Sequence, residues 1–203
     1  MISASPLFPA ATVLYELNAV LSDMYPDLYA IGVYQPTDPD SGEAITYTWP
    51  FRLPVDAKGI INVEALGSDG GWQRIDRWKW EPDADNQLEI AVARGTTVRV
   101  TYAREPGKFD HLDPQLADDW AGTTYLPDRV ADLVSLGVAA RLAPFLDLGR
   151  LTATGIEPRV DATRQIGAGA NLSKQLMQQF QMGLSREVQA LQKEHPIRLH
   201  REK

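Results

Sequence analysis

The chain has 203 residues, of which 44% are hydrophobic, and a formal net charge of −7. This length and composition are enough to bury the core of one large domain or two small ones, and the acidic balance argues against a general nucleic-acid-binding protein, which normally presents a basic face. The absence of cysteine excludes disulfides and thiolate metal sites, and with no signal-like N-terminus and no run of about 18 apolar residues we expect a soluble protein.

The first predicted element is a helix over residues 9–24. Its apolar residues share one face at 3.6-residue spacing: Val13, Leu14, Leu17, Val20, Leu21 and Met24. Pro26 predicts the end of this helix, and the apolar sequence LYAIGVY (28–34) then predicts a short strand. The next loop, 37–43, begins like a calcium-binding loop, with acidic residues at alternate positions. Because Trp49 stands where an EF-hand carries its bidentate glutamate, we interpret the loop as a solvated turn.

From Ile45 the apolar pattern changes to a period of two, which is typical of β-strands with one buried face. Strands are predicted over 45–53, 59–66, 72–80, 87–93 and 96–103. Pro50 lacks an amide hydrogen and predicts an edge or a bulge, and the odd position of Ile75 among even-numbered tryptophans predicts another bulge. In the second strand, the residues expected to face inward are Ile61, Val63 and Ala65. The pattern predicts an antiparallel meander over about 28–103, forming a sandwich or half-barrel of about five or six strands.

Most of the tryptophans lie in this β module: Trp49, Trp72, Trp78 and Trp80. They could form an aromatic platform that binds a sugar or a peptide. Alternatively, they fill a thin core or cover its open edge. We favour the second interpretation because basic residues are interleaved with them, namely Arg74, Arg77 and Lys79.

The stretch 126–149 predicts the clearest buried helix in the chain. Its main apolar face consists of Val130, Leu133, Val134, Val138, Leu142, Phe145 and Leu146. Pro127 suits a first helical position, and Gly149 suits a left-handed residue that ends a helix. Pro144 cannot continue the hydrogen-bond ladder, so we expect a kink or a break near Leu142.

Apolar surface on this helix extends beyond its main face. Leu136 lies off that face, and the alanines beside it would let a second helix approach closely. Because the surface is broader than one partner helix needs, we expect packing on at least two sides. Two interpretations remain open: the core helix of a small domain, and a contact between subunits with the candidate residues Leu136, Ala139 and Ala143.

Residues 105–125 connect the sheet to this helix. His111 lies between Asp110 and Asp113, a grouping that could bind a metal ion or relay a proton, but no second histidine is nearby and a solvated linker is favoured. The sequence has no phosphate loop, dinucleotide fingerprint, nucleophile elbow or zincin helix. We therefore expect no catalytic residue, no cofactor and no metal ion, and we predict that the protein is not an enzyme.

The C-terminal part begins with an irregular arm, 150–169. Residues 170–194 then predict a long helix with one narrow apolar stripe: Leu172, Leu176, Phe180, Leu184, Val188 and Leu191. Glutamine dominates its other sides. The tail 195–203 is basic on an otherwise acidic chain, so it is either a frayed terminus or a segment that docks on an acidic partner through Arg198, His200, Arg201 and Lys203. We expect that deletion of 195–203 leaves the fold intact and weakens such docking.

These elements predict an α+β fold. A small helical bundle has helices near 9–24, 127–148 and 170–194, and an antiparallel β module over about 28–103 is inserted into it. The predicted division is residues 1–27 with 104–194 as the helical domain, 28–103 as the β module, and 195–203 as a tail.

The order of the elements resembles a known family. A helix, a β module, LPDRVADLVSLGVAARLAPFLDLGR, an irregular arm, a glutamine-rich helix and EHPIRLHR follow one another as in the head-to-tail connector (adaptor) proteins of long-tailed bacteriophages, in particular phages of actinobacteria. The resemblance depends on the stretches 126–150 and 170–194. It implies a helical bundle with inserted β structure, and it transfers no functional residue by motif.

The resemblance also implies a function. Such a protein is a structural component of the virion that forms a ring between portal and tail and contributes to the DNA channel. Its expected partners are other copies of itself in a ring, expected to be a dodecamer, the portal protein, and the next neck or tail protein. It would be made in the host cytoplasm and located at the neck of the virion, with no sequence-specific binding of nucleic acid and no membrane. Because the β module is larger than expected, a stopper or tail-completion protein remains an alternative, as does a carbohydrate- or peptide-binding module that uses the tryptophans.

Overall fold

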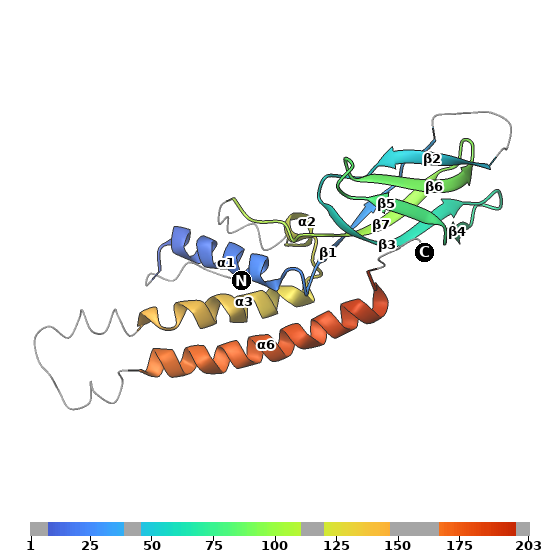
Figure 1. Ribbon diagram of the computed structural model, residues 1–203. Coiled ribbons are helices and arrows are strands. Elements are labelled where there is room, and N and C mark those ends of the chain that lie inside the picture. Colours follow the sequence, from blue (N-terminus) through green and yellow to red (C-terminus); the bar gives the residue numbers. More distant parts are fainter. Residues whose placement is uncertain (1–7, 39–45, 111–119, 147–166, 198–203) are drawn as a thin grey trace, which may run out of the picture. The chain divides into compact units, whose positions relative to one another are not determined.

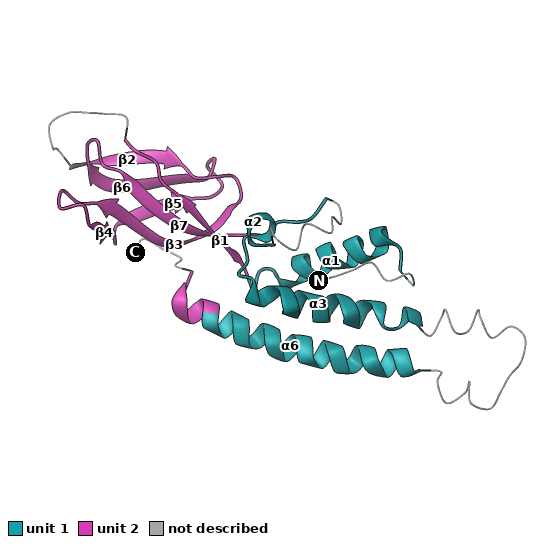
Figure 2. Ribbon diagram, turned by 180° about the vertical axis from the view of Figure 1, so that it is seen from behind, with its two compact units in different colours: residues 1–28, 106–190 teal, residues 29–105, 191–203 magenta. Residues whose placement is uncertain are grey.

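The computed structural model describes residues 8–38, 46–110, 120–146 and 167–197 (Figure 1). These form two compact units, residues 1–28 with 106–190 and residues 29–105 with 191–203 (Figure 2). The described parts contain four helices and two antiparallel sheets, which confirms the predicted α+β class. The units differ from the predicted division at the C-terminus, because the residues from Leu191 onward group with the strands.

The helices are α1 (Ala10–Met24), α2 (Trp120–Thr124), α3 (Arg129–Leu142) and α6 (Ala168–Glu194). The predictions of helices over 9–24 and 170–194 are confirmed to within two residues at each end. The first residue of α3 comes two positions after Pro127, whose carbonyl accepts the Val130 amide at 2.9 Å. The predicted break near Leu142 is confirmed, since α3 ends there and a turn follows at Ala143 and Pro144. Gly149 and residues 150–166 of the predicted arm lie outside the described residues, whereas the end of that arm belongs to α6, which begins at Ala168.

In the helical unit, α3 lies between α1 and α6. Gly137 marks the place where all three helices meet. A Cβ atom there would lie 2.8 Å from Cγ1 of Val20 on α1 and 3.0 Å from the ring of Phe180 on α6. Val20, Val134 and Phe180 are buried around it. The missing side chain therefore allows two helices to approach the same point of α3.

The β unit is a sandwich of two sheets. One sheet has the order β1 (Ala30–Tyr34), β7 (Val98–Arg104), β3 (Ala57–Leu66) and β4 (Trp72–Arg74); the other has the order β2 (Thr46–Arg52), β6 (Gln87–Ala93) and β5 (Trp78–Glu81). Side chains of both sheets share one core, among them Ile60, Val63, Val98 and Val100 from the first sheet and Trp49, Leu88, Ile90 and Val92 from the second.

The predicted meander is wrong, although the alternative of a sandwich agrees with the two layers. β6 and β7 follow one another in sequence but belong to different sheets. The predicted strand over 72–80 is likewise two short strands, β4 and β5, one in each sheet. The odd position of Ile75 thus marks a crossing between sheets, and no bulge is needed there. The edge position predicted from Pro50 is confirmed, because β2 pairs with β6 alone among the described strands.

Two expectations about individual side chains were also wrong. The pairing of β3 with β7 shifts register between Ile60 and Asn62, so Ile60 joins the core in place of the expected Ile61, which is 5% exposed but lies outside that core. Asp38, expected in a solvated turn, is 4% exposed. Its carboxylate accepts the Tyr47 hydroxyl and, at 3.1 Å, the Gly95 amide, so it connects three segments of the sandwich. Residues 39–45 of that loop lie outside the described part.

Candidate assembly surface

The contact between α3 and α6 follows one line along both helices. At one end, the Ser173 hydroxyl donates to the Ala140 carbonyl at 2.6 Å. Further along, a Cβ atom on Gly183 would lie 2.7 Å from Cδ1 of Leu133. At the other end, Arg129 and Glu187 form an ion pair at 2.8 Å. Residues from the end of α3 meet residues from the start of α6, and the reverse holds at the other end, so the two helices run antiparallel and are joined by their side chains.

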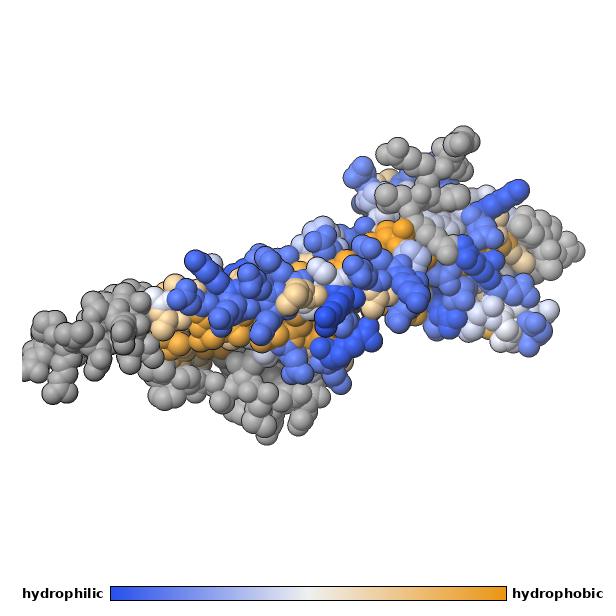
Figure 3. Space-filling model, turned by 90° about the horizontal axis from the view of Figure 1, so that it is seen from below, coloured by the Kyte–Doolittle hydropathy of each residue, from blue (hydrophilic) through white to orange (hydrophobic). Residues whose placement is uncertain are grey.

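One flank of this contact is apolar and exposed. On α6, Leu172 and Leu176 lie in one row with Gly183, and on α3, Leu136 follows Leu133 by less than one turn. Gly183 and Leu133 face each other across the contact. Leu172 and Leu176 on α6 and Leu136 on α3 all lie to the same side of this contact, so they share one flank of the helix pair. Leu172 is 41% exposed, and Leu136 and Leu176 are half-buried. Seen from below, apolar side chains gather in a band along the helical unit (Figure 3).

The opposite flank is closed by α1. Arg141 lies on the side of α3 away from Leu136, and its guanidinium contacts the carboxylates of Glu16, at 3.3 Å, and Asp23. The Arg141 and Glu16 side chains are 28% and 16% exposed, so this pair is partly shielded from water. In the described residues, α3 thus has one side that is covered by α1 and one open side, on which Leu136 and Ala139 lie beside the exposed Asp132.

The predicted subunit-contact residues differ in exposure. Ala139 is exposed and Leu136 is half-buried, but Ala143 is 3% exposed and its methyl group is already packed within its own chain. The open surface instead continues onto α6, and we name it the α3–α6 band: Leu136, Ala139, Leu172 and Leu176. Sequence periodicity missed the α6 members because it assigned the whole apolar stripe of that helix to the core. The subunit contact itself stays a prediction.

The C-terminal segment after α6 is attached to the β unit. The Tyr29 hydroxyl donates to the His195 carbonyl. Burial raises the pKa of this hydroxyl above its ordinary value of 10.0, so it remains a protonated donor at neutral pH. Ile197 covers Gly59, where a Cβ atom would lie 2.9 Å from Cγ2 of Ile197. The predicted docking residues of the tail, Arg198, His200, Arg201 and Lys203, lie outside the described residues.

Comparisons with protein-family models, with curated proteins and with solved structures gave no match. The function of this chain must therefore be argued from its own residues and surfaces.

The four tryptophans of the β unit do not form one exposed platform. Trp49 and Trp78 are each 8% exposed and belong to the sandwich core, as the favoured interpretation predicts. Trp72 lies on the outer side of β4, where the Arg99 guanidinium covers its ring at 4.4 Å from the centroid. Trp80 is partly buried at the end of the sandwich. A sugar platform made of all four is therefore not available.

The described residues show no arrangement typical of metal chemistry. No group of three or more His, Asp or Glu side chains within them is placed to hold a metal ion. His111 and Asp113 lie outside the described part. The grouping that could bind a metal ion or relay a proton is therefore not described by the structure. Long as α6 is, neither it nor another described helix is apolar enough to cross a membrane.

Proposed function

We propose that this chain is a structural virion protein that joins the head of a long-tailed bacteriophage to its tail as a ring-forming connector. Two features support the proposal: the order of elements, which resembles the adaptor family, and an α+β architecture in which a β unit interrupts a set of helices. In the proposed arrangement the helices form the bundle of the adaptor, and the ring lies between the portal and the next neck or tail protein. A stopper or tail-completion protein is the alternative within the same assembly.

The α3–α6 band is the observation that carries the proposal. Burial of a leucine side chain stabilises an assembly by about 1.5–3 kcal/mol, and an exposed apolar row beside polar residues is typical of a protein interface. The polar residues beside the band include neutral amides of α6, among them Gln175, Gln178 and Gln179, and the exposed Asp132, one turn before Leu136 on α3. These side chains would form the polar rim of such an interface. A ring requires that each subunit contacts its neighbour through two different surfaces, of which the band would be one.

The net charge of −7 fits a position around DNA. An acidic channel repels the phosphate backbone and lets the genome pass without binding. This charge concerns the whole chain and does not identify the residues that line the channel.

The test is the mass of the assembly that the full chain forms, alone and with the portal protein, by native mass spectrometry and negative-stain microscopy. We expect a ring for the wild type and loss of the ring for Leu172→Glu, because the new carboxylate would be buried at the subunit contact. Met182→Glu is the matched control, since Met182 is 58% exposed on another side of α6. A chain that stays monomeric with the portal, or a Leu172→Glu variant that still forms rings, contradicts the proposal.

A further inference from the structure

The β unit contains a hollow that the proposed ring does not use. It opens at the end of the sandwich where the β2–β3 connection meets the β5–β6 connection, and its apolar walls come from Leu53, Val55, Ala57, Trp80 and Pro82. Leu53 and Ala57 form its base, at 4% and 5% exposure. Val55, by contrast, is 93% exposed. A fully exposed valine beside an apolar hollow leaves apolar surface that a ligand could cover.

The walls of the hollow are fixed before any ligand arrives. The Trp80 indole N–H donates to Oδ1 of Asn86 at 2.7 Å. Nδ2 of Asn86 donates in turn to the Pro54 carbonyl at 2.7 Å and to the Ala57 carbonyl at 3.3 Å. These bonds join both connections, so the indole is held in place. They also use the neutral hydrogen-bonding groups of Trp80 and Asn86, which leaves few such groups for the hydroxyls of a sugar.

Among the described residues that line the hollow, the charged side chains are Arg52, Lys58 and Asp85, so the lining is positive on balance. Arg52 and Asp85 pair at 2.7 Å and largely neutralise each other. Lys58 is exposed, and no carboxylate of the described residues lies within ion-pair distance of it. It is the extra residue of a β-bulge, because the register passes from Ala57 paired with Arg104 to Gly59 paired with Ala103. A bulge redirects a side chain away from the regular alternation of the strand, here to the rim.

We propose that this hollow binds an extended acidic peptide segment of a partner protein. One apolar side chain of the peptide would lie between Val55 and Trp80, and the carboxylate of the following residue would pair with Lys58. Charge complementarity selects this occupant: the chain is acidic overall, yet the described side chains that line the hollow are positive on balance. The site lies within the β unit and does not depend on the proposed ring.

The probes are two dye-labelled peptides, Gly-Leu-Asp-Asp-Gly and Gly-Leu-Asn-Asn-Gly, titrated with the full chain and followed by fluorescence anisotropy. A single buried side chain with one ion pair leads us to expect a Kd on the order of 0.1–1 mM for the acidic peptide. The neutral peptide should bind roughly tenfold more weakly. Lys58→Glu should remove this preference, and Val55→Ser should weaken both peptides.

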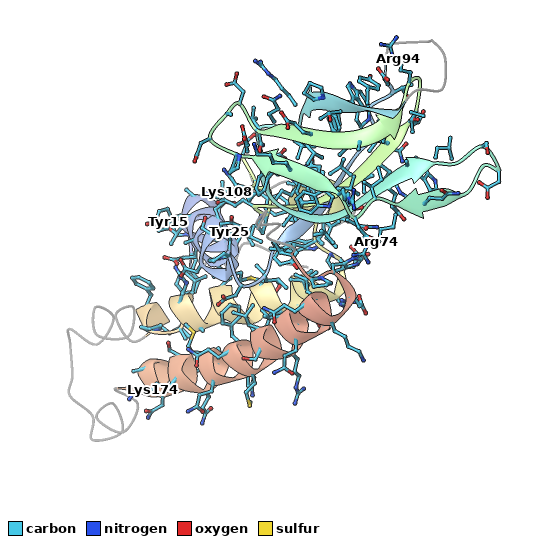
Figure 4. All side chains as sticks on the ribbon, turned by 45° about the vertical axis from the view of Figure 1, so that its right-hand side comes forward. Tyr15, Tyr25, Arg74, Arg94, Lys108 and Lys174 are labelled. Atoms are coloured by element: carbon cyan, nitrogen blue, oxygen red, sulfur yellow. The ribbon has the colours of Figure 1, made fainter. Side chains whose placement is uncertain are left out.

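Arg94→Glu is the control, because it makes the same change of charge at the other end of β6 (Figure 4). It should leave both affinities within about twofold of the wild type. Circular dichroism checks the fold of each variant, and Lys58 and Val55 are exposed, so their replacement should not disturb the core. No saturable binding, equal binding of the two peptides, an unchanged preference in Lys58→Glu, or displacement of the acidic peptide by an oligosaccharide would each overturn the proposal.

Discussion

Several residues of the β unit have roles that depend on their backbone conformation as much as on their side chains. Asp85 and Asn86 both have positive φ angles, 56° and 58°, and so both occupy the left-handed region. Their side chains differ completely. Asn86 is 8% exposed and holds three hydrogen bonds, whereas the Asp85 side chain is 72% exposed and pairs with Arg52 at the surface.

Replacement of these two residues separates backbone strain from hydrogen bonding. Asn86→Gly keeps the left-handed conformation but removes the side chain, so we expect the free energy of unfolding to fall by about 2 kcal/mol. Asn86→Ala should lose about 1 kcal/mol more, because a Cβ atom disfavours this conformation. Asp85→Gly should change stability by less than about 0.5 kcal/mol, since an exposed ion pair contributes little. Urea unfolding measures all three variants, and equal losses at both positions would contradict the assignment.

Sequence alone does not identify Asn86 or Asp38 as structural residues. Both types are common in solvated turns, and each lies in a loop rich in Asp and Pro. Their burial depends on contacts with distant residues: Asn86 bonds to Pro54 and Ala57, and Asp38 bonds to Gly95. Periodicity describes only neighbours along the chain and therefore has no signal for such contacts.

At the scale of single elements, the sequence was informative where an element has one buried face. The helix α1 and the edge strand β2 could be predicted because apolar residues recur at the period of the element. The prediction failed in β3, where the extra residues Lys58 and Ile61 change the alternation. A bulge is set by the pairing with β7, so the inward-facing residues of β3 cannot be derived from that strand alone.

Two glycines lie at the contacts of α3, Gly137 on α3 itself and Gly183 on α6, and their replacement by alanine gives a pair of variants that can be compared. Gly137→Ala and Gly183→Ala each gain about 1 kcal/mol of helix propensity. At Gly137, however, the new methyl group would meet buried Val20 and the Phe180 ring, neither of which can move away easily. At Gly183 it would meet only the end of the flexible Leu133 side chain. We expect a net loss of about 1 kcal/mol for Gly137→Ala and a change within about 0.5 kcal/mol for Gly183→Ala, measured by thermal unfolding. A stabilised Gly137→Ala variant would show that the three helices do not meet at this point.

For the whole molecule, the important contacts join segments that are far apart in sequence. The chain leaves the helical unit after Leu28, forms the sandwich and returns at Pro106. Immediately after the return, the Asn18 side-chain amide donates to the Phe109 carbonyl at 2.8 Å and accepts the Phe109 amide at 2.9 Å. The returning segment is thereby fixed to α1. The α3–α6 band and the hollow beside Trp80 belong to different units, so assembly and peptide binding can be tested by separate substitutions.

The attachment of the C-terminal segment divides the predicted tail into two parts. The contacts described for this segment, with Tyr29 and Gly59, come from His195 and Ile197. Deletion of 198–203 keeps both of these contacts, so we expect an unfolding temperature close to that of the wild type. Deletion of 195–203 should destabilise the protein by about 1–3 kcal/mol, because it leaves the Tyr29 hydroxyl without its acceptor and removes Ile197 from Gly59. That the fold survives the longer deletion stays a prediction, to which the contacts of His195 and Ile197 add an expected loss of stability.

The two deletions also test whether the basic residues dock on a partner ring. If they do, removal of 198–203 should weaken the joining of heads to tails in a reconstitution assay while the mass of the isolated ring stays the same. Lowering the salt concentration should strengthen docking of the full chain and have little effect on the truncated one, because salt screens the attraction between basic residues and an acidic partner. The variant with Arg198, Arg201 and Lys203 replaced by glutamine keeps the chain length and should behave like the deletion. Full joining activity with a salt dependence equal to that of the wild type would show that the basic residues do not take part in docking.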